Sequence, residues 1–253
     1  MNEAGLQVFF IRRAGFGRTT ALPRLLLSSE HIDSGSAQVT EATIINYLLD
    51  AYDLTGAVLL TIGTAGPIGV RLISMSTRIR FSIFANPAFN QDKGDGFKPG
   101  WLNSMLEEAI LNRPATRLAS RGFKFQLKRN FASFYRNLLQ RSDGDLHYLD
   151  NYQSDYEEAS RVLSQVSSDT FFYHFRSALS KDAIMKDGFF RSHNAVATQG
   201  TQTTEMIARN LKEECRRLAI PIEYHSSGYR MLPYTSPGFL LGLMGNYAGP
   251  IVS

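Results

Sequence analysis

The sequence predicts an α+β fold, with a strand-rich N-terminal part that contains hairpins, a helix-richer C-terminal part, and an apolar C-terminal tail rich in glycine and proline. Three observations support this class. Runs of β-forming residues gather before residue 86, the clearest helical periodicity comes after residue 150, and strand and helix patterns do not alternate regularly. Without that alternation, an α+β arrangement is favoured over a doubly wound parallel sheet.

The N-terminal segment predicts a strand followed by a helix. Residues 5–12 (GLQVFFIR) are rich in β-forming residues, and residues 13–20 contain the glycines of a turn. Thr40 is a residue type that favours the N-cap, and apolar residues follow it at helical spacing as far as Tyr52. Gly56 then stands where a glycine ends a helix.

The next segment predicts a hairpin and a further strand. Residues 57–62 and 68–74 are β-rich runs separated by Gly63-Thr64-Ala65-Gly66-Pro67, a sequence typical of a turn. Residues 77–84 alternate between apolar and polar side chains, as in a half-buried strand. The polar stretch 86–100 contains prolines and glycines. It marks the boundary if residues 1–253 form two closely packed lobes rather than a single domain.

Helices are expected in the second half of the chain. Residues 122–128 still alternate and predict a strand, but Ser154-Asp155-Tyr156-Glu157 has the spacing of a capping box that opens a helix. Thr203 or Thr204 opens the clearest helix in the sequence, and residues 220–225 predict a short extended piece after it.

The tail from Pro237 to Ser253 is apolar, yet it contains too many glycines to predict a good helix. We expect it to close the core of its own subunit, and insertion into a neighbouring subunit is the alternative.

Charge is unevenly distributed, although the chain carries only a small excess of 27 Lys and Arg over 23 Asp and Glu. Residues 113–141 contain eight basic side chains, no acidic one, and several aromatic residues, and an acidic stretch follows at residues 143–158. Cations interleaved with aromatics favour single-stranded nucleic acids, because phosphates are neutralised and bases stack on the rings. The predicted nucleic-acid-binding residues are Arg78, Arg80, Arg113, Arg117, Arg121, Lys124, Lys128, Arg129, Arg136, Arg141 and Tyr135.

This pattern predicts a self-associating structural protein, similar to a viral nucleoprotein or coat, whose partners are RNA or single-stranded DNA and further copies of itself. Two other interpretations remain open. The basic segment forms an ordinary solvated face, or the protein is a non-enzymatic scaffold that binds an acidic protein.

An enzymatic alternative rests on a short motif. Tyr173-His174-Phe175-Arg176, followed by Ala183-Ile184-Met185-Lys186-Asp187-Gly188, resembles the opening motif of ADP-ribosyltransferases of the DNA-targeting toxin type. The resemblance covers about 16 residues of the chain. It implies that His174 holds the nicotinamide ribose and that Glu205 or Glu223 orients it for attack.

Other chemistry finds little support in the sequence. No Gly-x-Ser-x-Gly elbow occurs, and the five histidines lack the spacing of a metal site, so we expect neither a cofactor nor a metal, and a protein that is not an enzyme. Cys215 lies on the apolar face of its helix and is expected in the core. Neither a signal peptide nor a membrane span is expected, which predicts a protein that is cytoplasmic, or within a virion, and not secreted.

Overall fold

The structure is a computed structural model, and every statement about it concerns the residues that it describes. These are residues 7–14, 19, 34–87, 118, 121–122, 124–125, 128–130, 147, 150–167, 170, 188–201, 205–225 and 236–248.

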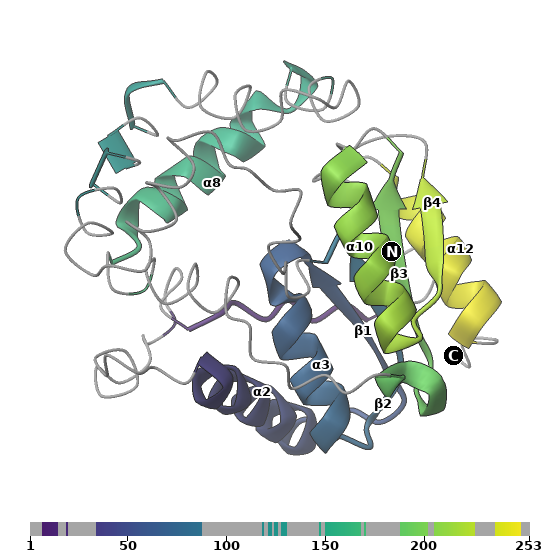
Figure 1. The fold of residues 1–253 in the computed structure, drawn as a ribbon. Coiled ribbons are helices and arrows are strands. Elements are labelled where there is room, and N and C mark those ends of the chain that lie inside the picture. The colour runs from purple at the N-terminus through teal and green to yellow at the C-terminus, as the bar shows by residue number, and fades with distance from the viewer. Residues whose placement is uncertain are drawn as a thin grey trace.

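The centre of the fold is a sheet of four parallel strands in the order β1-β2-β3-β4 (Figure 1). Parallel strands require a long crossover between them and are covered by helices on both faces, which favours apolar sequences such as those of the first two strands. The strands are β1 (Ala57–Ile62), β2 (Ile79–Ala85), β3 (Ala195–Gly200) and β4 (Ile222–His225).

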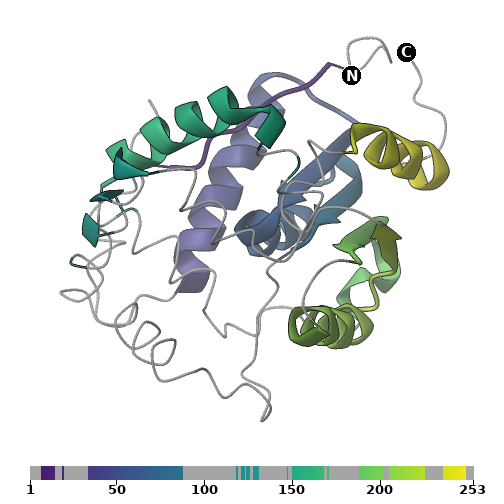
Figure 2. The same ribbon diagram turned by 90° about the horizontal axis from the view of Figure 1, so that it is seen from above.

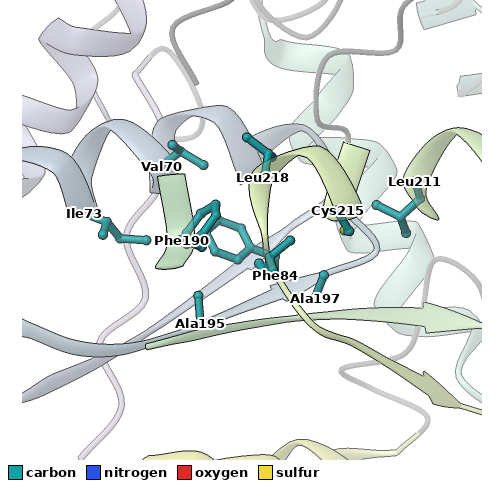
Figure 3. Close-up of a cluster of buried hydrophobic side chains, with 10 residues drawn as sticks. Val70, Ile73, Phe84, Phe190, Ala195, Ala197, Leu211, Cys215 and Leu218 are labelled. Carbon is teal, nitrogen blue, oxygen red and sulfur yellow. The ribbon is translucent and has the colours of Figure 1, made fainter. Parts of the chain in front are cut away.

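Helices α3 (Gly66–Met75) and α10 (Glu205–Leu218) cover one face of the sheet. Figure 3 shows their side chains meeting Phe84 of β2 and Ala197 of β3 in a buried cluster, to which the short helix η3 (Phe189–Ser192) adds Phe190. Helix α2 (Ser34–Ala51) packs on the outer side of α3. These helices are held by apolar burial, which stabilises a folded protein by about 25 cal/mol per Å².

Helix α12 (Pro237–Ala248) covers the opposite face, where Leu240 and Leu243 pack against Phe81 and Val196 (Figure 2). A further helix, α8 (Gln153–Gln165), lies apart from the sheet, on the side to which the carboxyl ends of the strands point (Figure 1). It belongs to the long chain segment between β2 and β3. The predicted lobe boundary at 86–100 stays a prediction, because residues 88–100 lie outside the described part.

The predicted α+β class is wrong, because the chain forms a parallel α/β sheet instead of hairpins. The error begins at residues 57–74. After β1 the chain makes a single turn of 3₁₀ helix, η2 (Gly63–Ala65), and continues into α3 rather than returning as an antiparallel strand. Pro67 lies in the first turn of α3, where proline is tolerated because no hydrogen-bond donor is needed. The β-branched residues of 68–74 therefore lie in a buried helix, because tertiary packing overrides their local preference for strands.

Three further expectations are wrong. Residues 7–12, the described part of the predicted first strand, belong to no strand, and the described residues of 122–128 are helical. The glycine-rich tail forms the helix α12, because its apolar side chains gain more by packing on the sheet than the exposed glycines lose.

Several expectations are confirmed. The helix after Thr203 and the extended piece at 220–225 are present as α10 and β4, and the helix predicted from the capping box is present as α8. Cys215 is buried in the core, and the tail closes the core of its own chain. Among the described residues, no helix has the length and apolar character needed to cross a membrane.

Candidate functional site

The candidate site is the edge of the sheet where the four parallel strands end. Ile62 of β1 pairs with Ala85 of β2, and Ala85 pairs with Thr198 of β3. The next residues along the strands, Gly63, Asn86 and Gln199, therefore form a row across this edge. In open α/β sheets, ligands bind outside the carboxyl ends of the strands. The row of Gly63, Asn86 and Gln199 is thus where a ligand is expected.

Gly63 forms the tip of the sharp turn between β1 and α3. Its φ is +55°, in the left-handed region that favours glycine. A Cβ atom added to Gly63 would have no other atom within 4 Å, so the tip faces open space. Residue 63 therefore places no side chain over the backbone at the point where the strand ends and the helix begins.

A close approach of β1 and α3 holds this turn. Gly69, on the second turn of α3, faces Thr61 of β1, and a Cβ atom at position 69 would lie 2.6 Å from Thr61 Cγ2. Only glycine leaves room for the threonine methyl group. The pair fixes the angle at which the helix leaves the strand.

Asn86 ties the middle of the edge together. Its φ of +45° is rare for a residue other than glycine, although asparagine tolerates it better than most. The Asn86 N–H donates to the carbonyl of Thr198 (3.1 Å), and the side-chain carbonyl of Asn86 accepts from the N–H of Gly200 (3.2 Å). These bonds continue the pairing of β2 and β3 beyond the last residue of β2.

Buried polar atoms without a hydrogen-bond partner gather near this edge. In the described part of the chain there are four such side-chain atoms, and three of them belong to Thr61, Thr198 and Gln199. Buried polar groups normally have partners, so each exception calls for an explanation. Unfilled hydrogen-bonding capacity at the ends of β1 and β3 is what a binding site for a polar ligand would display.

The end of β4 supplies the charged and titratable groups. Glu223 accepts a hydrogen bond from the hydroxyl group of Tyr247, and this bond, with some burial, raises the pKa of Tyr247. The ring of His225 lies against Phe239, with ring centroids 4.7 Å apart. Both Glu223 and His225 therefore contact α12. In the described residues, no group of three or more His, Cys, Asp or Glu side chains lies close enough to hold a metal ion.

The predicted basic surface is only partly described. The guanidinium group of Arg78 donates to the carboxylates of Asp50 (2.5 Å) and Asp53 (3.0 Å), and Asp53 and then Asp50 raise its pKa. Arg80 is the extra residue of a β-bulge, and its Nε atom is buried. These two side chains therefore do not form the exposed basic pair that the alternation of residues 77–84 indicated.

Four residues of the basic segment itself are described. Arg121, Lys128 and Arg129 are exposed, and burial lowers the pKa of Lys124, with a further contribution from Lys128. The guanidinium of Arg129 lies over the ring of Phe125, 5.9 Å from its centroid. Five further predicted residues lie outside the described part: Arg113, Arg117, Tyr135, Arg136 and Arg141.

The residues of the ADP-ribosyltransferase alternative are not brought together in the described structure. His174 lies outside the described residues, and Glu205 is described only in its backbone, as the first residue of α10. Glu223 is bound to Tyr247 at the end of β4.

Comparison with solved structures identifies the class of fold. An esterase from Exiguobacterium antarcticum has a TM-score of 0.63 at 13% identity, over 93% of this chain and 79% of the other. An α/β hydrolase enzyme from a deep-sea metagenome library of the Medee basin has a TM-score of 0.56 at 13% identity, over 94% and 77%. A bromoperoxidase from Bacillus anthracis has a TM-score of 0.58 at 17% identity, over 92% and 79%. No family model and no curated protein sequence matches the chain.

The chain therefore has the α/β hydrolase fold. This finding overturns the prediction of a nucleic-acid-binding structural protein of the nucleoprotein or coat type, with RNA, single-stranded DNA and further copies of itself as partners. The similar structures are described as an esterase, an α/β hydrolase and a bromoperoxidase, and none is described as a nucleoprotein or coat. The prediction failed because it assumed that basic residues close together in the sequence form one exposed surface. Arg78 is instead neutralised by carboxylates of the same chain.

Like the nucleophile elbow of α/β hydrolases, the turn after β1 joins a parallel strand to a helix. In α/β hydrolases a serine occupies a strained turn between strand and helix, in the motif Gly-x-Ser-x-Gly. The turn after β1 has the sequence Thr61-Ile62-Gly63-Thr64-Ala65, with Gly63 at its tip and no serine. The other triad members follow the nucleophile in the order Asp or Glu, then His. The first carboxylate after β3 is Glu205, and the last histidine of the chain is His225.

This strand-to-helix turn was not predicted, because the Gly-x-Ser-x-Gly motif is absent from the sequence. The turn from Thr61 to Ala65 contains no serine and does not match that motif. The small residues between Gly63 and Gly69 indicate a turn in the sequence, but they predicted the turn of a hairpin. Gly69 is the informative member of this set, because its lack of a side chain leaves room for the methyl group of Thr61.

Proposed function

We propose that this protein binds a small organic molecule at the carboxyl edge of its sheet and does not perform acyl transfer through a serine nucleophile. The observation that carries the proposal is Gly63 at the tip of the strand-to-helix turn, with a φ of +55° and open space in the direction of a side chain. The fold supports a site for small molecules, and the glycine removes the group that would attack them.

The chemical argument concerns the covalent step. Acyl transfer through an enzyme nucleophile needs a hydroxyl, thiol or carboxylate that can attack the carbonyl carbon of the substrate. Glycine provides none of these groups. Loss of the serine from a serine hydrolase lowers kcat by roughly 10⁶-fold. The residual rate would be too small to give the protein a useful turnover.

The rest of the site favours binding. The backbone N–H of the residue after the nucleophile is part of the oxyanion hole in enzymes of this fold, and that residue is Thr64 here. A bare glycine at position 63 lets a ligand approach the backbone closely. Unpartnered polar atoms of Thr198 and Gln199 lie on β3, two strands away from this turn.

A second candidate function is hydrolysis by direct attack of water. It is favoured by His225, which ends β4 at the same edge of the sheet and contacts Phe239. In this scheme the oxygen of water bonds to the carbonyl carbon, and the imidazole of His225 takes the proton of that water. The ester C–O bond then breaks, and the proton passes to the departing alkoxide.

The test is release of p-nitrophenol from p-nitrophenyl acetate and butyrate by the purified protein. We expect the wild type, Thr64→Ala and His225→Ala to release p-nitrophenol at equal rates, no faster than a matched inert protein. Mass spectrometry after treatment with a fluorophosphonate should find no adduct. These results follow if no nucleophile stands at the turn.

Other outcomes distinguish the alternatives. Turnover that disappears in Thr64→Ala would contradict the proposal, because the neighbouring hydroxyl would then be the nucleophile. Turnover that survives Thr64→Ala and disappears in His225→Ala would favour direct attack of water. In both cases, unchanged unfolding temperatures of the variants would show that the loss is chemical rather than structural.

A further inference from the structure

We propose that Gln199 is a ligand-binding residue of this site and that its ligand is a neutral molecule carrying a hydroxyl or amide group. This inference rests on the proposed function and deepens it, since it assigns a chemical class to the bound molecule. Three observations carry it: the place of Gln199 in the sheet, its buried side chain without a partner, and the uncharged residues that follow β1, β2 and β3 in the described structure.

Gln199 lies in the same row as the bare turn. It follows Thr198, whose partner is Ala85, and Gly63 follows Ile62, which also pairs with Ala85. Two strand spacings separate Gly63 from Gln199, which corresponds to about 10 Å. A molecule with a handful of heavy atoms placed on Gly63 therefore reaches Gln199 across Asn86.

The side chain of Gln199 is on the α3 and α10 face of the sheet. Side chains two residues apart in a strand share a face, and Ala197 packs in the cluster formed with α3 and α10. Gln199 follows that cluster at the carboxyl end of the strand. The ligand would thus bind where the apolar layer between sheet and helices ends.

The amide of Gln199 has hydrogen-bonding capacity that the protein leaves unused. The residue is only 3% exposed, and its Oε1 atom has no hydrogen-bond partner. The neighbouring Asn86 is different, because its amide oxygen accepts from the N–H of Gly200. An unsatisfied buried acceptor is unfavourable for the free protein, so a ligand hydroxyl or amide N–H that donates to it gains more than the same contact at an exposed site.

The surroundings favour a neutral ligand. The described residues that directly follow β1, β2 and β3 at this edge are uncharged: Gly63, Thr64, Ala65, Asn86, Pro87 and Thr201. A carboxylate or phosphate bound there would lose its hydration without meeting a cation. The nearest acidic residue in the sheet, Glu223, pairs with Thr198 and binds Tyr247 of α12, on the opposite face from Gln199.

The experiment introduces a thiol at the turn as a reporter. Gly63→Cys places a side chain in open space, and the native Cys215 is buried, so iodoacetamide should modify mainly the introduced thiol. The probes are benzamide, benzyl alcohol and benzoate, which share one ring and differ in the polar group. Mass spectrometry measures the rate of modification. Gly245→Cys, at an exposed position of α12, is the matched control.

We expect benzamide and benzyl alcohol to slow modification in Gly63→Cys and to leave Gly245→Cys unaffected, while benzoate protects neither. When Gln199→Met is combined with Gly63→Cys, the benzamide concentration that gives half-maximal protection should rise roughly three- to tenfold. This is the change in affinity expected for the loss of one neutral hydrogen bond. Equal protection by benzoate, unchanged protection in Gln199→Met, or no protection by any probe would overturn the inference.

Thermal unfolding separates a binding role from a structural one. Because its amide has no partner, Gln199→Met should leave the unfolding temperature of the free protein unchanged or raise it. Gln38, an equally buried glutamine in α2 that does have an interaction partner, is the control, and Gln38→Met should lower it. A lower unfolding temperature in Gln199→Met would count against the inference. Rapid turnover of p-nitrophenyl esters would refute the proposed function alone and leave these results standing.

Discussion

Gly69 of α3 and Thr61 of β1 pack so closely that a Cβ atom on residue 69 would lie 2.6 Å from the Thr61 methyl carbon. The same Cβ would lie 3.2 Å from Phe84 Cε1. In a parallel α/β fold, this contact sets how near the helix after the turn comes to the sheet. The identity of residue 61 and that of residue 69 are therefore coupled.

We predict that Gly69→Ala destabilises the protein by about 1–3 kcal/mol, the range for an overpacked core position. Thr61→Ser removes the methyl group that the new Cβ would strike. The double variant Thr61→Ser, Gly69→Ala should therefore lose less stability than the sum of the single variants, by at least about 0.5 kcal/mol. Urea unfolding of the four proteins measures this coupling, and additive effects would show that the two residues do not share the contact.

The turn residue Gly63 should respond to substitution through its backbone. Gly63→Ala meets no atom within 4 Å, but its φ of +55° costs a residue with a Cβ about 1–2 kcal/mol. Gly245→Ala, at an exposed helical position with equal space, should instead gain roughly 0.5–1 kcal/mol. Opposite signs in denaturant unfolding are the expected result. Equal effects would mean that the turn does not hold its left-handed conformation.

The ion pair between Arg13 and the buried Glu41 should stabilise the packing of the N-terminal segment against α2. Arg13 Nη2 donates to Glu41 Oε2 at 2.9 Å, and Glu41, which is 4% exposed, also accepts from the N–H of Ala14. Glu41→Ala leaves the guanidinium without its partner and should cost about 3 kcal/mol, because breaking a buried pair strands a charge.

The exposed pair of Arg161 and Glu158 on α8 provides the control for this effect. Glu158→Ala should leave the unfolding midpoint within experimental error, since exposed pairs contribute little. Chemical unfolding of both variants gives the comparison. A loss in Glu158→Ala as large as that in Glu41→Ala would remove burial as the explanation.

Cys215 should be inert in the folded protein and should make stability depend on alkaline pH. Burial, and then the charge of Glu214, raises the pKa of its thiol from 9.0 to about 12. The unfolded chain therefore releases this proton first as the pH rises. Stability is fully present below pH 9 and falls as the pH rises toward 12. Cys215→Ala should show a shallower alkaline decline in urea unfolding measured at several pH values.

A thiol reagent provides an independent check on Cys215. At pH 8 the folded protein should react with the reagent only as fast as it unfolds, and the urea-denatured protein should react at once. Rapid reaction of the native thiol would mean that the residue is accessible and that the alkaline decline has another origin.

The sequence alone determined those elements whose local pattern fits only one type of secondary structure. The spacing of apolar residues before Pro221 predicted α10, and the same spacing placed Cys215 in the core. The capping box at residues 154–157 predicted α8. In each of these cases, side-chain periodicity and end signals agree, so neighbouring residues contain all the information that the element needs.

Tertiary structure decided the pairing of strands and, with it, the site. Residues 68–74 are β-branched enough for a strand, yet they form a helix because β1 and β2 are parallel and need a crossover between them. That crossover makes Gly63 the tip of the turn and brings Asn86 and Gln199 into one row with it. The contacts between β2 and β3 join residues more than a hundred positions apart, and no local pattern encodes them.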